Sequence, residues 1–148
     1  GARLRHGPGS AIGDGSIVYR GVQLLAIGEG RFTIGAGSHI APMGYLLVGP
    51  STLHIGDGVA IGPQLALFCQ TNDTRAGTPF AEQHRQAPVH IGSNVYIGAQ
   101  VTVLPGSYLA REANGINPGD NFIRMALVAS TQECVEAAQR IVQFVKSL

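Results

Sequence analysis

Aliphatic residues recur between Ile12 and Pro105, many of them six positions apart, and a glycine usually follows. The aliphatic-glycine pairs are Ile12-Gly13, Ile27-Gly28, Ile34-Gly35, Ile55-Gly56, Ile61-Gly62, Ile91-Gly92 and Ile97-Gly98. Val18, Ile40, Leu67 and Val103 fit the same pattern without the glycine. A period of six matches neither the 3.6 of an α-helix nor the 2 of an ordinary strand.

A strand that turns a corner every six residues accounts for this period. Each aliphatic side chain then points into a shared interior, and the glycines and other turn residues that follow it relieve the steric cost of the corner. Three such sides close one coil, and coils stack as parallel strands about 4.7–4.9 Å apart. The pattern therefore predicts an all-β solenoid, a parallel β-helix over residues 12–106, after a short lead-in at residues 1–11.

Two segments depart from the period. The polar stretch CQTNDTRAGTPFAEQHRQA, within residues 69–88, reads as an excursion loop, with disorder as the alternative. After Gly106, FIRMALVA predicts a strand, and the capping box Ser130-Thr131-Gln132-Glu133 predicts a helix at residues 131–147 in the tail 107–148. The apolar stripe of that helix must be covered by the open end of the solenoid or by a neighbouring subunit.

Composition narrows the class of protein. At 148 residues the chain has room for one compact domain, or for one domain with a short appendage, and 45% hydrophobic content argues against disorder. A net charge of +1 with scattered arginines excludes a nucleic-acid surface. Cys69 and Cys134 are too few for a disulfide scaffold and lack zinc spacing, and no apolar run reaches about 18 residues. We expect a cytoplasmic protein without membrane insertion.

The segments IGDGVAIGPQLALF and PVHIGSNVYIGAQVTVLPG resemble the hexapeptide-repeat acyltransferases, and the loop between them resembles the sugar O-acetyltransferase branch. This resemblance covers about two thirds of the chain. It implies a left-handed coil, an exception to the right-handed crossover rule. It also implies a homotrimer with an active site between two subunits, acetyl-CoA as co-substrate, and a small hydroxylated acceptor such as a sugar.

The same resemblance indicates which residues form the site. The family's histidine base is expected where TNDT places Asn72, and an amide can position a hydroxyl or donate to an oxyanion but cannot remove a proton. His84 is the histidine that could replace it, with a solvated loop residue as the alternative. Asp73 and Arg75 are the expected acceptor-binding residues. For acetyl-CoA, the resemblance implies Tyr96, in the place of the family's usual tryptophan, and the small residues Gly98 and Ala99, which are otherwise ordinary corner residues. The further coils that complete a donor site do not follow Gly106.

Three histidines directly precede inward aliphatic residues, so His39, His54 and His90 should point outward. If the loop leaves from one corner, Ile91 stacks over Ile55 and brings His54 beside His90. Such a pair could bind a metal. The repeated His-Gly pairs of γ-type carbonic anhydrases are absent, however, and we predict no metal site.

Residues from Val101 to Leu148 carry a second resemblance, to the C-terminal end of class I aminotransferases of the succinyldiaminopimelate type. Arg124 occupies the place of the arginine that grips the substrate carboxylate there. Transamination needs a lysine for pyridoxal phosphate, and Lys146 in the final helix is the only lysine. Two hypotheses therefore stand: an acetyl-CoA-dependent O-acetyltransferase, or a catalytically inactive β-helix module that arose by gene fusion.

Overall fold

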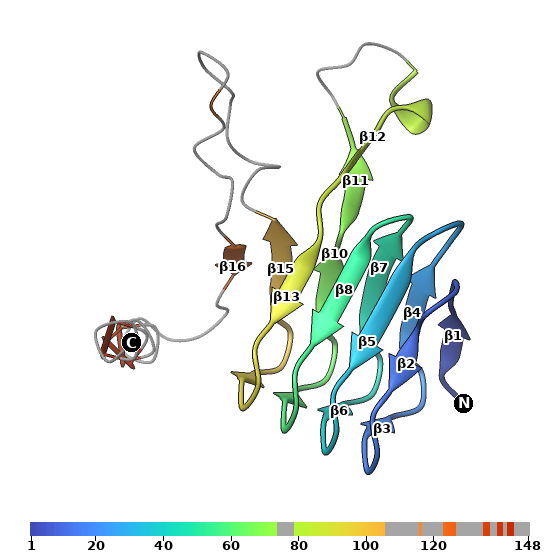
Figure 1. Cartoon of the computed structure of the whole chain (residues 1–148). Helices are drawn as coiled ribbons and strands as arrows, with labels where there is room; N and C mark the ends of the chain where they lie inside the picture. The colour runs from blue at the N-terminus through green and yellow to red at the C-terminus, as the bar shows by residue number, and fades with distance from the viewer. Residues whose placement is uncertain are drawn as a thin grey trace.

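The chain folds as a left-handed parallel β-helix, seen in a computed structural model (Figure 1). The structure describes residues 1–73, 79–105, 116, 123–126, 135–136, 139–140 and 142–143. Three sheets form the sides of a prism, and the chain visits them in turn, so that neighbouring strands in each sheet come from successive coils. The solenoid predicted from the six-residue period is confirmed.

Each side of the prism is one sheet. Sheet A contains β1 (Arg3–Arg5), β4 (Gln23–Ala26), β7 (Tyr45–Gly49), β10 (Ala66–Phe68), β15 (Thr102–Pro105) and β16 (Ile123–Ala126). Sheet B contains β2 (Ala11–Ile12), β5 (Arg31–Ile34), β8 (Thr52–Ile55) and β13 (Val89–Ile91). Sheet C contains β3 (Ile17–Val18), β6 (His39–Ile40), β9 (Ala60–Ile61) and β14 (Tyr96–Ile97).

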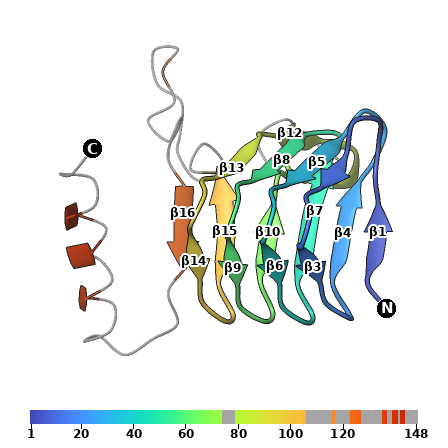
Figure 2. The same cartoon turned by 60° about the horizontal axis from the view of Figure 1, so that its bottom comes forward.

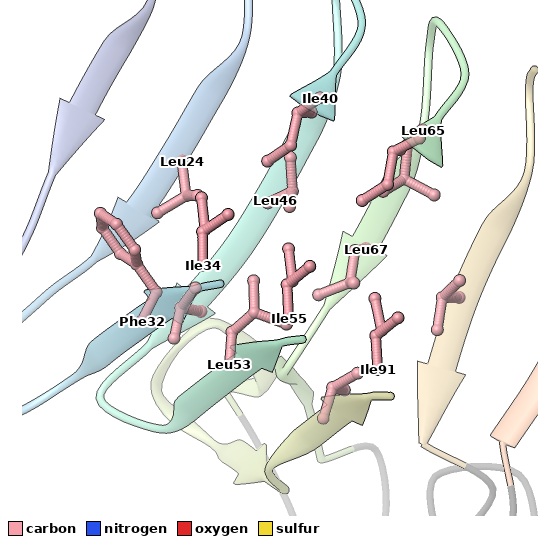
Figure 3. Packing of buried hydrophobic residues seen from close by; sticks show 14 of the residues in the cluster. Leu24, Phe32, Ile34, Ile40, Leu46, Leu53, Ile55, Leu65, Leu67 and Ile91 are labelled. Atoms are coloured by element: carbon pink, nitrogen blue, oxygen red, sulfur yellow. The ribbon is translucent and has the colours of Figure 1, made fainter. Parts of the chain in front are cut away.

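The aliphatic column of sheet B shows how the sequence period becomes a core. Ile12 pairs with Ile34, Ile34 with Ile55, and Ile55 with Ile91 in parallel register. Side chains from all three sheets point into the shared interior (Figure 3), where Leu24, Leu46, Leu53, Ile55, Ile61 and Leu67 are completely buried. This burial, at roughly 25 cal/mol per Å² of apolar surface, is the main source of stability for the stack.

Two details of the repeat differ from the expectation. A coil is longer than three six-residue sides, because Thr33 and the equivalent His54 are 21 residues apart. The additional residues lie at the corner between sheets A and B. Ile27 lies there and is 40% exposed, so its placement among the inward residues was wrong. Its Ile-Gly pair marks a turn at this corner, because β4 ends at Ala26.

The interruption at residues 69–88 forms an excursion that contains an antiparallel hairpin. Strands β11 (Gln70–Asn72) and β12 (His84–Gln86) pair, and a 3-10 helix, η1 (Phe80–Glu82), precedes β12. The hairpin connects β10 of sheet A to β13 of sheet B, so it leaves from the A/B corner. Sheet C is the third side of the prism and therefore lies opposite the hairpin, as both views show (Figures 1 and 2).

The strand predicted over FIRMALVA is present as β16. It pairs antiparallel with β15, where a further coil would otherwise add a parallel strand. Of the predicted helix 131–147, residues 135–136, 139–140 and 142–143 are α-helical, and the others lie outside the described residues. Within the described part of the chain, no helix is long and apolar enough to span a membrane.

Candidate functional site

The excursion hairpin brings two of the predicted catalytic residues together. Asn72 and His84 are register partners in the antiparallel pair β11–β12. Residues directly opposite in such a pair share a face, with Cβ atoms roughly 4.5–5.5 Å apart. Both side chains are exposed to solvent. The hairpin therefore places Asn72 and His84 side by side, although they are twelve positions apart in sequence.

The opposite face of the hairpin carries an ion pair. Asp73 Oδ2 lies 3.9 Å from Arg85 Nε, and the Asp73 amide donates to the Gln83 carbonyl at 2.8 Å. Asp73 is thus engaged by the hairpin itself. Arg85 was not among the residues predicted for the site; its only sequence signal is the alternation of β12. Arg75 lies outside the described residues.

Asn72 and His84 supply complementary chemistry. A neutral imidazole nitrogen accepts a proton from a hydroxyl, and a carboxamide NH₂ donates hydrogen bonds to a developing oxyanion. The pair is open to water in a single chain. Acyl transfer needs a covered site, because water competes with the acceptor hydroxyl for the activated acyl group. A second surface must therefore close over this face of the hairpin for such chemistry.

Cys69, at the base of the hairpin, is excluded as a nucleophile. Its side chain is completely buried, and its Sγ lies 3.8 Å from the Thr52 carbonyl oxygen. Burial raises the pKa of the thiol to about 12, although a hydrogen bond from the backbone of Val89 opposes the rise. The reactive form of cysteine is the thiolate, which this environment suppresses at neutral pH.

Next along the chain, Gln70 packs its side chain against Gly49, which has a positive φ of 62°. The Gln70 Oε1 atom is buried and has no hydrogen-bond partner among the described residues. A Cβ at position 49 would collide with that oxygen. Glycine at position 49 therefore provides the room in which the amide of Gln70 packs.

The residues expected to bind the acyl donor lie on the far side of the prism. Tyr96 projects from sheet C with 76% of its surface exposed, and Gly98 and Ala99 follow at the corner between sheets C and A. A Cβ at Gly98 would meet no atom within 4 Å, so the backbone is open to approach there. Beside Ala99, the side-chain Nε2 of Gln100 donates a hydrogen bond of 2.8 Å to Gln64 Oε1 on the adjacent coil.

The histidines adjoining the core lie as predicted. His90 pairs with His54 on the outer face of sheet B, with ring centroids 4.4 Å apart and ring planes 21° from parallel. Near-parallel stacked rings do not direct their nitrogens at one point, as shared metal ligands must. Among the residues that the structure describes, no group of three or more His, Cys, Asp or Glu side chains could hold a metal ion.

Comparison of the chain with protein-family models, curated proteins and solved structures finds no match.

Proposed function

We propose that the protein is an acetyl-CoA-dependent O-acetyltransferase acting on a sugar or a similar hydroxylated acceptor. The observation that carries this proposal is the register pairing of Asn72 with His84 on an excursion from a β-helix. The sequence resemblance to the sugar O-acetyltransferase branch supports it. Asn72, which stands where that branch has its histidine, thereby acquires a basic neighbour.

The proposed reaction divides the roles between the two residues. His84 removes the proton of the acceptor hydroxyl as its oxygen attacks the thioester carbonyl carbon. Asn72 donates a hydrogen bond to the oxyanion that forms on the carbonyl oxygen. As the carbon–sulfur bond breaks, His84 returns the proton to the departing sulfur. The products are the acetyl ester and free coenzyme A.

The positions of the proposed residues support a site between two subunits. The hairpin leaves the A/B corner, whereas Tyr96 lies on sheet C, the opposite side of the same chain. One chain therefore cannot close its own donor surface over its own hairpin. A closed ring of three copies, each placing its sheet C against the next copy's hairpin, creates three equivalent sites. We propose this homotrimer as the active form, acting in the cytoplasm.

Release of coenzyme A thiol from acetyl-CoA, measured across a panel of sugars, tests the proposal. We expect acceptor-dependent release by the wild-type protein and a loss of at least about a hundredfold in His84→Gln, the range typical of a removed general base. The exposed residue His6, in the lead-in, provides the matched control His6→Gln, which should retain activity. Acceptor-dependent release that is equal in wild type and His84→Gln rejects the assigned role. If no acceptor causes release of coenzyme A, the proposed acetyltransferase activity is rejected.

A catalytically inactive binding or structural module is the second candidate function. Two observations favour it: Asn72 is not a base, and β16 occupies the edge of β15 on which another coil would extend a donor site. Under this alternative, Asn72→His creates no acetyl transfer. A clear gain of transfer in that variant supports an intact enzyme framework instead.

A further inference from the structure

The exposed face of the hairpin continues onto sheet B. From His84 to His90, exposure alternates along the chain: His84, Gln86, Pro88 and His90 are exposed, whereas Arg85, Ala87 and Val89 are covered or buried. Strand β12 leads directly into β13 in Figure 1. The side chains that share a face with Asn72 and His84 therefore lead to the outer surface of sheet B.

On sheet B this face meets a cross-strand row of polar side chains. His90 stacks on His54, and the Nδ1 of His54 shares a hydrogen bond of 2.7 Å with Thr33 Oγ1. Thr52 lies beside this row, two residues before His54 on β8. We call Thr33, Thr52, His54, Gln86 and His90 the sheet B platform.

The platform is rich in hydrogen-bonding groups that carry no fixed charge. Hydroxyl, amide and imidazole groups both donate and accept. Arg31, at the start of β5, is the only charged residue in the strands of sheet B; it pairs with Thr52, in the row next to the one that contains Thr33, His54 and His90. Apart from Arg31 at this edge, the platform offers little to a phosphate or carboxylate. It matches a neutral ligand that presents many hydroxyl groups.

We propose that the sheet B platform is a binding subsite for the distal units of a neutral oligosaccharide. This inference rests on the proposed function and narrows its acceptor from a single sugar to an extended chain. His90 lies six positions after His84 along β12, Ala87, Pro88 and β13, an extended path of about 20 Å, which is longer than one sugar ring. The acceptor hydroxyl lies at His84, and the rest of the chain follows β12 and β13 to the stacked histidines.

Binding measured without acetyl-CoA tests the subsite independently of catalysis. The probes are glucose and xylose and their β-1,4-linked oligomers of two to six units, titrated by calorimetry. We expect affinity to rise with length in the wild-type protein. We expect His90→Ala to weaken binding of the six-unit oligomer about fivefold, as for one lost hydrogen-bonding group, and to leave the shortest binding oligomer unchanged. His6→Ala is the exposed control, and Thr33→Val tests the platform without removing a ring.

The outcomes separate this inference from the proposed enzyme. Length-dependent binding that His90→Ala reduces, without any acetyl transfer, supports the platform and rejects the acetyltransferase. Acetyl transfer to single sugars, together with equal affinity for oligomers of every length, supports the acetyltransferase and rejects the platform. Absence of binding to every oligomer overturns the platform, as does an equal loss of affinity in His6→Ala. Circular dichroism of each variant establishes that it folds.

Discussion

His90 lies face to face with His54, although 36 positions separate them in sequence, with imidazole centroids 4.4 Å apart. The parallel register of β13 and β8 causes this contact, because it aligns Ile91 with Ile55 inside the prism and the preceding residues outside it. The excursion of residues 69–88 therefore adds chain without shifting the register of the coils on either side. The stacking of the two imidazole rings is a direct consequence of this register.

A double-mutant cycle on this pair measures how strongly the coil after the hairpin is held to the coil before it. We expect His54→Ala and His90→Ala to be coupled by about 0.5–1 kcal/mol in the free energy of unfolding, as for other ring pairs at exposed positions. Urea unfolding of the two single variants and the double variant gives the coupling. His6→Ala with His90→Ala is the control and should be additive. Coupling no larger than in that control contradicts a stabilising stack.

The buried interior could be predicted from the sequence, because an aliphatic residue repeated at the same place in each coil must stack on its equivalents. Ile34, Ile55 and Ile91 each precede a corner glycine, and stacking them buries one continuous column. Corner lengths were less predictable: Ile27 has the same Ile-Gly signature but lies at a corner with additional residues, so it is exposed. A local dipeptide does not distinguish a buried side chain from a turn.

The candidate site was predictable only in part, for a related reason. His84 and Asn72 were identified from the chemistry of a loop, but their direct opposition follows from hairpin pairing, which has no period to reveal it. The same pairing puts Arg85 near Asp73, a contact without a sequence signal. The pairing of β16 with β15 likewise depends on tertiary structure. The segment FIRMALVA predicts a strand, but strand propensity does not indicate which strand it pairs with.

The glycines that follow the aliphatic column of sheet B should differ sharply in how well they tolerate substitution by alanine. A Cβ at Gly35 would lie 2.5 Å from the Gly56 carbonyl carbon and 2.6 Å from the Asp57 nitrogen of the next coil, and backbone cannot move aside cheaply. We expect Gly35→Ala to cost about 2 kcal/mol or more in unfolding free energy. Gly92 is the matched control, because a Cβ there meets nothing within 4 Å, and Gly92→Ala should be neutral or slightly stabilising. Equal urea midpoints for the two variants contradict this account.

Buried Cys69 predicts a specific loss of stability in alkali. Burial raises the pKa of this thiol from 9.0 to about 12, so between these values the unfolded chain ionises Cys69 while the folded chain keeps it protonated. The folded-state pKa is the higher one, and the stabilisation is therefore complete below about pH 9 and lost as pH rises toward 12. Each unit of the shift corresponds to about 1.4 kcal/mol, which sets an order of magnitude of a few kcal/mol.

Comparison with Cys69→Ala isolates this effect, since every other ionisable group is the same in the two proteins. The variant loses some packing at every pH, because Cys69 is completely buried. Above pH 9, however, its unfolding free energy should fall less steeply than that of the wild type, and the two curves should converge by about pH 11. Urea unfolding at half-unit steps from pH 8 to 11 provides the curves. Parallel curves across this range would mean that the folded chain lets Cys69 ionise, and hence that water reaches the base of the hairpin.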